Sequence, residues 1–294
     1  MKRLLFLLLL VSQIAYGQKV TTYGGKALTY GGDVATYAYC DEYQAVYDAY
    51  TVKPSDATAA VWNTFVTKCV ATGEWAALDV LWNYAGVSDN TNGEALINWK
   101  LPGTFDATAY NAPTFTALEG FTGNGTTQYI DCNWNPSVNG VNYVRNSASM
   151  IIYVRTNIAA DGQHGIGNAA DFKNIFILPK YTIDNSYIRT NDATTISGAN
   201  SDGSGMFINT RTASTVNKLY KNKVAIINAT SVSTGMPTHL AYCLAINDDD
   251  VATGFRADQV SMYAFGGGMT QTQVTNLTTY YEAAMDALGK GVIP

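Results

Sequence analysis

The spacing of apolar side chains changes along the chain from a helical period to the alternating pattern of strands. In the first third of the chain apolar residues recur every three or four positions, which predicts helices over residues 41–50, 55–73 and 75–85. These helices would form a small module over residues 39–95. Such a module must pack against another part of the chain, because so short a bundle buries little core by itself.

Beyond Pro102 short β-prone runs are separated by Gly, Asn and Asp, the residues that form turns. These runs predict strands over residues 114–118, 128–133, 149–156, 174–177, 187–190, 205–212, 215–220, 224–229, 239–246 and 259–265. A final helix is expected to begin at Thr270, whose spacing to Gln273 is that of a capping box, and to end at Gly289. The pattern indicates a mainly β protein built as a sandwich.

The N-terminus carries the pattern of a secretory signal peptide, with two basic residues, an apolar run and small residues before the cleavage position. An uncut membrane anchor is the alternative, but about ten apolar residues are too few to cross a bilayer. The next segment repeats the motif Thr-Tyr-Gly-Gly, which suits small hairpins or an extended arm, with a flexible leader as the alternative. The expected organisation is a signal peptide (1–17), an arm (18–38), a helical module (39–95), a linker (96–112) and a β-sandwich with a C-terminal helix (113–294).

The composition excludes some classes of partner. Charged residues make up 14% of the chain and the net charge is -5, with no basic cluster, so electrostatic binding of nucleic acid is not expected. No segment after the signal peptide is apolar over a length that crosses a membrane. The 20 tyrosines are a positive signal, because tyrosine offers rigid contact area with a polar tip at sugar-binding and protein-binding surfaces.

None of the four cysteines lies in a Cys-x-x-Cys pair, so a metal site is disfavoured and two disulfides in an exported protein are expected. Three pairings exist, and we favour Cys40 with Cys69 in the helical segment and Cys132 with Cys243 in the strands. Free buried thiols are the alternative.

Several segments of the β region resemble the LamG-like, concanavalin A-like jelly roll. Residues 119–131, with an aromatic residue and glycines before a Tyr-Ile strand, look like the opening of that domain, and residues 148–155 look like its next long strand. Residues 218–223 are similar to the family's Leu-Tyr-x-Asn-Gly hairpin, except that Lys223 replaces the turn glycine and leaves the turn type open. The closing strand and helix of this chain are similar to the end of the domain.

The order of helical segment, Asn-Trp-x-x-Pro linker and jelly roll also resembles modules in structural and tail-fibre proteins of phages that infect Bacteroidetes. This resemblance implies a non-enzymatic virion or tail-associated protein, assembled with other virion or surface subunits and oligomeric. The alternative is a host-encoded secreted glycan-binding protein. The expected location is exported, in the periplasm, at the cell surface or outside the cell, or in the virion.

No catalytic residues are expected. Glucanases on this fold need two nearby carboxylates on one strand, whereas the only glutamates of the sandwich region are Glu119 and Glu282, far apart in the sequence. The two histidines, His164 and His239, lie near no nucleophile motif. An enzyme of the sandwich fold is therefore only a third hypothesis.

Ligand binding is expected from aromatic residues in loops with polar neighbours, because sugar rings stack on aromatic faces while their hydroxyls need polar partners. The candidates are Trp134, Tyr143, Tyr181 and Tyr187. The acidic run at residues 247–250 is a candidate calcium site, with Asp248 and Asp250 as first choices and a solvated turn as the alternative.

Overall fold

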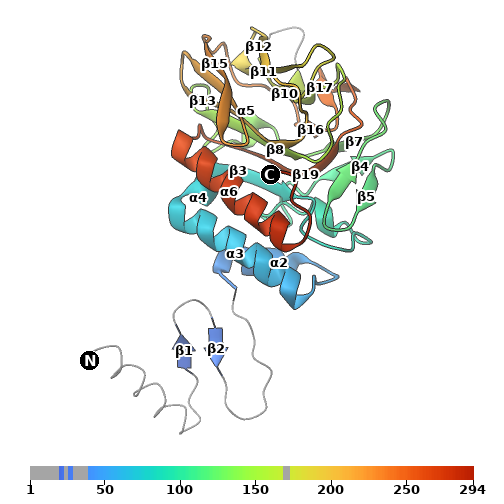
Figure 1. Cartoon of the computed structure of the whole chain (residues 1–294), viewed down its shortest axis with the longest axis vertical. Coiled ribbons are helices and arrows are strands. Elements are labelled where there is room, and N and C mark those ends of the chain that lie inside the picture. The colour runs from blue at the N-terminus through green and yellow to red at the C-terminus, as the bar shows by residue number, and fades with distance from the viewer. Residues whose placement is uncertain (1–19, 23–25, 29–38, 168–172) are drawn as a thin grey trace, which may run out of the picture.

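The computed structural model describes residues 20–22, 26–28 and 39–294 except 168–172 (Figure 1). The predicted signal peptide lies outside the described residues, and so does most of the predicted arm. Of the arm, β1 (Val20–Thr22) and β2 (Lys26–Leu28) form an antiparallel pair. In the described part of the chain no helix combines the length and the apolar character needed to cross a lipid bilayer.

Two sheets make up the sandwich. We call the first the covered sheet; its strand order is β15-β14-β13-β8-β19-β6-β5, and β3 pairs with β19. Its strands are β3 (Leu78–Asn83), β5 (Thr114–Thr116), β6 (Gly120–Thr122), β8 (Ala148–Val154), β13 (Gly205–Ala213), β14 (Val216–Lys221), β15 (Val224–Thr230) and β19 (Gln259–Gly266).

We call the second the open sheet; its strand order is β12-β11-β10-β9-β16-β7-β4, with the β17–β18 hairpin attached to β9. Its strands are β4 (Thr108–Tyr110), β7 (Tyr129–Asp131), β9 (His164–Gly167), β10 (Asn174–Leu178), β11 (Asn185–Asp192), β12 (Ile196–Ala199), β16 (Tyr242–Cys243), β17 (Ile246–Asp248) and β18 (Val251–Thr253). Side chains from both sheets fill the space between them, including Ile152, Ile177, Ile188 and Tyr263. The fold is the mainly β sandwich predicted from the sequence.

The helices form a third layer. They are α2 (Asp41–Ala49), α3 (Asp56–Thr72), α4 (Glu74–Ala77), the 3-10 turn η1 (Glu94–Leu96), α5 (Pro136–Asn139) and α6 (Gln271–Ala287). The Tyr281 hydroxyl of α6 donates to Asn83 Oδ1 of β3 at 2.9 Å, and the Tyr153 hydroxyl of β8 donates to Glu282 of α6 at 2.5 Å. Trp62 of α3 packs on the Tyr281 ring at 5.7 Å. Figure 1 shows α2, α3 and α6 together on one side of the sandwich, away from the open sheet.

Local sequence explains where the long helices begin and end. Ser55 caps α3 by accepting a hydrogen bond from the Thr58 N–H, and α3 ends at Gly73, which adopts φ +92°. The predicted capping box of Thr270 and Gln273 is present at the start of α6. These motifs satisfy backbone groups that a helix leaves unpaired at its ends.

The predicted third helix is wrong beyond Ala77. Residues 78–83 form the strand β3, which pairs with β19 of the covered sheet. All six of its side chains are buried, because the sandwich core lies on one face and the helices lie on the other. A strand buried on both faces loses the polar–apolar alternation that marks a strand in the sequence.

The predicted disulfides are also wrong, since all four cysteines are free. The Cys40 N–H donates to Asn63 of α3, and Cys69 lies six residues further along that helix, about 9 Å away along the helix axis. Cys243 pairs with Ile130, so Cys132 is only its diagonal neighbour, at a typical separation of about 7 to 8 Å. Both separations exceed the usual span of a disulfide.

Candidate functional site

The outer face of the open sheet holds a cavity of about 680 Å³, which we call the groove. Its floor follows from strand alternation in β10 and β11. One set of side chains points into the sandwich core: Ile175, Ile177 and Ile188. The alternate set lines the groove: Asn174, Phe176, Leu178, Tyr187 and Arg189.

The β17–β18 hairpin forms one wall of the groove, contributing Ile246, Asp248 and Thr253. This wall stands close to β9 because β9 has glycine where it faces the hairpin. A Cβ atom on Gly167 would lie 3.0 Å from the Ile246 side chain and 3.3 Å from the Asp248 carboxylate. The glycine therefore lets the wall approach while keeping the floor free of a side chain.

Two tyrosines form the aromatic part of the groove. The rings of Tyr181 and Tyr187 lie 5.5 Å apart with an angle of 85° between their planes. The turn between β10 and β11 holds Tyr181 in place, since its N–H donates to the Asn185 carbonyl at 2.7 Å and its own carbonyl accepts from Asp184 at 3.1 Å. Both rings are half-buried and line the cavity. The arrangement offers a planar ring something to stack on and an edge beside it.

Arg189 supplies the positive charge of the groove. Its guanidinium carbon lies 5.6 Å from the centre of the Phe176 ring, and its Nε donates to Thr195 Oγ1 at 2.9 Å. Burial lowers the pKa of Arg189, and the charge of Asp192 opposes that shift. Its Nη groups make no hydrogen bond within the described residues. A guanidinium held by its Nε and by a ring face presents its remaining N–H groups to a ligand.

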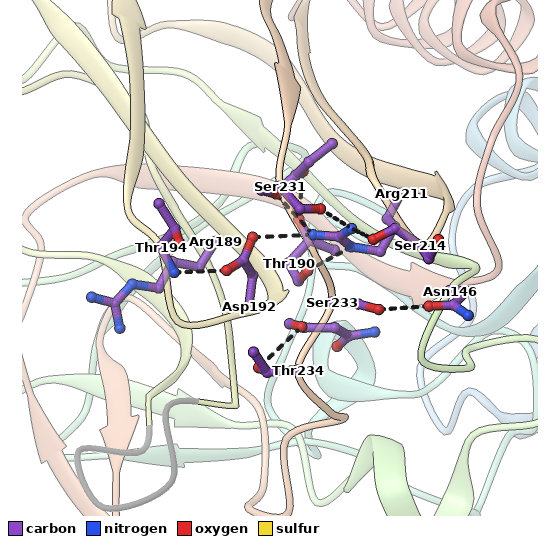
Figure 2. Close-up of polar contacts among 12 residues, drawn as sticks. Asn146, Arg189, Thr190, Asp192, Thr194, Arg211, Ser214, Ser231, Ser233 and Thr234 are labelled. Carbon is purple, nitrogen blue, oxygen red and sulfur yellow. Dashed lines mark hydrogen bonds and ion pairs between the residues drawn. The ribbon is translucent and has the colours of Figure 1, made fainter.

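A buried arginine fixes the turn that carries Thr195. Figure 2 shows Arg211 reaching Asp192 and Ser231, with Asp192 in turn bonded to Thr194. Arg211 Nη2 lies 3.3 Å from Asp192 Oδ2, and Asp192 Oδ1 accepts the Thr194 N–H at 2.7 Å. The turn between β11 and β12 is therefore anchored inside the sandwich, and Thr195 is held where it can bond Arg189.

A second buried arginine fixes the opposite rim. Arg256 is bonded to the Asp258 carboxylate, and its Nη groups donate at 3.0–3.1 Å to the main-chain carbonyls of Ile158, Ala160 and Gly162. This loop carries Asp161 and Gln163 into the groove lining. Both ends of the groove thus rest on charged hydrogen bonds that are shielded from water, which makes them strong.

Asp258 also contacts a buried histidine. His164 Nε2 lies 3.0 Å from Asp258 Oδ2, and His164 Nδ1 accepts the Leu244 N–H at 3.0 Å, with Cys243 Sγ at 3.9 Å. A Cys–His–Asp trio has the composition of a catalytic triad. All three side chains are, however, fully buried, burial raises the pKa of the Cys243 thiol, and Nδ1 already has a donor. We therefore assign the trio a structural role.

The structure separates the four aromatic residues predicted to bind ligand. Tyr181 and Tyr187 come together in the groove. Trp134 and Tyr143 are fully buried in the core, where Trp134 packs on Phe265 at 5.1 Å, so neither presents a ring to a ligand. Sequence reasoning missed Phe176, Arg189 and the loop of Asp161. The signal for Arg189 was its spacing of two from Tyr187, which puts both side chains on one face of a strand.

The acidic run lies in the turn of the β17–β18 hairpin. Asp249 and Asp250 adopt φ of 51° and 66°, the backbone of a tight hairpin turn. Asp248 lines the groove, whereas Asp250 contacts His239 at 2.9 Å, so the two predicted ligands do not share a site. Within the described ranges no group of three or more His, Cys, Asp or Glu side chains is placed to hold a metal ion. Calcium binding stays a prediction.

No model of a known protein family matches the chain, and no curated protein matches it. Among solved structures, the chain is similar to a mutant of the Trypanosoma rangeli sialidase that displays trans-sialidase activity, with 12% identity and a TM-score of 0.50. The match covers 80% of this chain but only 40% of the sialidase, so the chain spans less than half of that protein.

It is also similar to domain 4 of the extracellular arabinanase AbnA of Geobacillus stearothermophilus, solved in complex with arabinotriose. That match has 17% identity and a TM-score of 0.43, and covers 68% of this chain and 98% of the domain. At such identities the likeness concerns the fold. The match to the sialidase agrees with the predicted fold, a β-sandwich of two antiparallel sheets. Neither structure is a phage protein, and the phage part of the resemblance stays a prediction.

Proposed function

We propose that this chain is an exported, non-enzymatic glycan-binding protein whose ligand lies in the groove. The observation that carries the proposal is the convergence of two perpendicular tyrosine rings and a ring-stacked guanidinium in one cavity of about 680 Å³. This volume lies within the range of about 300 to 1,000 Å³ that small-molecule sites occupy. The predicted export of the chain is consistent with glycan binding, because an exported protein encounters extracellular sugars.

The chemistry of the lining suits a hydroxyl-rich ring. Tyr181 and Tyr187 offer apolar faces to the C–H side of a sugar. The Nη groups of Arg189 donate to hydroxyl oxygens, while the carboxylates of Asp161 and Asp248 accept from hydroxyl hydrogens. A sugar ring needs both kinds of partner at its edge and a flat apolar surface below.

The groove favours the secreted glycan-binding protein over the virion protein predicted first from the resemblance. A subunit contact in a virion calls for a broad, complementary surface, whereas the groove is concave and carries a few convergent polar groups. The virion role stays a prediction, which the recovery of this chain from purified particles would test.

The experiment is affinity gel electrophoresis of the full chain in gels that contain arabinan, xylan, galactomannan, mixed-linkage β-glucan or polygalacturonate. We expect at least one of them to retard the wild-type protein, and Tyr187→Ala to weaken that binding at least about tenfold, because the variant removes a central ring of the site. Tyr187→Phe keeps the ring and should bind as the wild type does.

The matched control is Tyr280→Ala on α6, which removes a half-buried tyrosine from the helical side of the molecule. It should leave retardation unchanged. Wild-type protein that migrates identically in all five gels, or equal weakening by Tyr187→Ala and Tyr280→Ala, would reject the groove as a glycan site.

A further inference from the structure

Three tyrosines stack on the outer face of the open sheet, beside the groove. They come from three neighbouring strands: Tyr110 of β4, Tyr129 of β7 and Tyr242 of β16. The rings of Tyr110 and Tyr129 lie 4.8 Å apart and 2° from parallel, and the rings of Tyr129 and Tyr242 lie 4.7 Å apart. We call this row the tyrosine ladder. It runs from Tyr110, which is 43% exposed, to Tyr242, which is buried.

The ladder is not part of the sandwich core. The core-facing residues of these strands are Ile130 and Cys243, which alternate with the tyrosines, and none of the three tyrosines belongs to the core cluster. Cross-strand ring pairs stabilise sheets by themselves. The ladder therefore needs a second observation before it can be assigned to a ligand.

That observation is the carboxylate of Asp131. Asp131 pairs with Tyr242 across β7 and β16, so it lies on the ladder's face of the sheet, and it is only 6% exposed. Its Oδ1 accepts the Asn133 N–H at 2.8 Å, whereas Oδ2 makes no hydrogen bond within the part of the chain that the structure describes. Oδ2 is not among the buried side-chain atoms that lack a partner, so it lies where solvent reaches it. It is thus a carboxylate oxygen with no protein donor, open to a group from outside. A ligand hydroxyl would supply that donor.

The charges around the tyrosine ladder indicate whether its ligand is neutral or acidic. Burial raises the pKa of the Asp131 carboxyl, and the carboxylate of Asp250 adds to the shift. Asp250 and the neighbouring Asp249 both contact His239. This surface therefore disfavours an acidic sugar, because the Asp131 carboxylate lies on the ladder's face and the charge of Asp250 is close enough to act on it.

We infer that the tyrosine ladder is a second binding area, which takes a neutral sugar ring against Tyr110 with a hydroxyl donated to Asp131. This inference rests on the proposed function of the groove. The two areas adjoin: the Phe255 ring lies 6.3 Å from that of Tyr129, and Phe255 directly follows Gly254, which lines the groove. One linear neutral glycan of several units thus contacts both areas.

Contact at two areas on one chain makes the second contact intramolecular, which raises the affinity for a long ligand far more than for a short one. The ladder therefore predicts that affinity depends on glycan length. The probes are the neutral polymers of the same panel, arabinan, xylan, galactomannan and β-glucan, and the trisaccharide of whichever polymer retards the wild-type protein most strongly.

The variants are Tyr110→Ala, Tyr110→Phe and Tyr187→Ala, with thermal unfolding of each to establish that it folds. Tyr110 is exposed on a short edge strand, so its removal should not unfold the protein. We expect Tyr110→Ala to weaken binding of the polymer about tenfold and to leave trisaccharide binding unchanged. Tyr110→Phe should match the wild type, and Asp131→Asn should weaken binding of the polymer only.

The outcomes separate the two proposals. Loss of binding in Tyr187→Ala with wild-type polymer affinity in Tyr110→Ala overturns the ladder and leaves the groove standing. Equal loss for polymer and trisaccharide in Tyr110→Ala also overturns it, since the ladder would then not act as a separate area. A wild-type protein that binds none of the polymers rejects the proposed function, and the ladder with it.

Discussion

The two outer faces of the sandwich use the same residue type in opposite ways. Between the covered sheet and its helices, Tyr153 of β8 and Tyr281 of α6 are fully buried, and their hydroxyls donate to Glu282 and Asn83. On the open sheet, Tyr181 and Tyr187 are half-buried, and their hydroxyls make no hydrogen bond within the described residues. Burial raises the pKa of Tyr281 well above its usual range, because its surroundings exclude water.

This difference shows that the role of a tyrosine depends on whether other elements of the fold cover it, and not on the residue type. Helices α3 and α6 cover the face of the first sheet, so its tyrosines are core residues with paired hydroxyls. The face of the second sheet has a groove and an exposed ladder instead. Substitutions on the first face should therefore change stability, and substitutions on the second should change binding.

The largest expected effect is on the covered face. Tyr281→Ala removes a ring that packs against Trp62, Phe65 and Tyr153, and should lower the free energy of unfolding by about 3 to 5 kcal/mol. Tyr187→Ala should lower it by less than about 1 kcal/mol, because its ring is partly exposed. Urea unfolding followed by circular dichroism measures both.

The control is Tyr281→Phe, which keeps the ring but loses the hydrogen bond to Asn83 and should cost about 1 kcal/mol. The comparison of the two faces breaks down if Tyr187→Ala destabilises the protein as much as Tyr281→Ala does. In that case the groove would be a packing defect in the core and not a site.

An intermediate effect on stability is expected when the pH changes. It comes from His164, which is buried between the sheets. Burial lowers the pKa of His164 below its ordinary value of 6.5, although Asp258 opposes the shift. As the pH falls through about 6.5, His164 binds a proton in the unfolded chain but not in the folded protein. The free energy of unfolding must therefore fall with acidification. The melting temperature should therefore drop between about pH 7.5 and about pH 5.

His164→Gln removes this titration and should have a shallower dependence of melting temperature on pH over that interval. A parallel dependence in both proteins would exclude His164 as the source. Asp258 acts at lower pH: burial by itself raises its pKa, but the His164 hydrogen bond and the charge of Arg256 outweigh burial and lower it. Its stabilising contribution is present above the ordinary pKa of an aspartate and is lost as the pH falls from there through the lowered pKa of the folded protein.

The smallest change in stability is expected from substitutions in the turn between β14 and β15, on the covered sheet. Asn222 and Lys223 adopt φ of 47° and 79°, so the hairpin has the left-handed backbone that glycine favours. Lys223→Gly should raise the free energy of unfolding by up to about 1 kcal/mol and leave polysaccharide binding unchanged. Asn222→Gly is the contrasting variant: it should destabilise, because Asn222 Oδ1 accepts the Met206 N–H at 2.9 Å. Altered binding in Lys223→Gly would show that the two faces are coupled.

Much of the fold could be predicted because its signals are local. The capping residues Ser55 and Thr270 located two helix starts, β-prone runs between turn residues located β8 and β13, and alternation located β19. The strand β3 was predicted as part of a helix because its apolar residues Leu78, Leu81 and Trp82 recur at helical spacing. The strand β9 was not predicted because its sequence is His-Gly-Ile-Gly, and glycine has a low propensity for strands.

The site was less predictable, because it depends on which loop is covered. The local sequence around Trp134 resembles that around Tyr181, with an aromatic residue among Asn and Asp. Only the tertiary structure buries the first fully and leaves the second half-buried in the groove. Likewise, Arg189 and Asp248 belong to strands far apart in the sequence, and their convergence follows from the order of strands in the sheet.

The two buried arginines have a consequence for how this protein can evolve. Arg256 holds its rim of the groove through main-chain carbonyls, and Arg211 likewise donates to the carbonyls of Ser214 and Ser231. A carbonyl is present whatever the side chain, so mutations at rim positions such as Asp161 can accumulate without loosening the frame. Selection can then change the chemistry of the groove while the scaffold is inherited intact, and descendants of one such gene can diverge at the groove with little loss of stability.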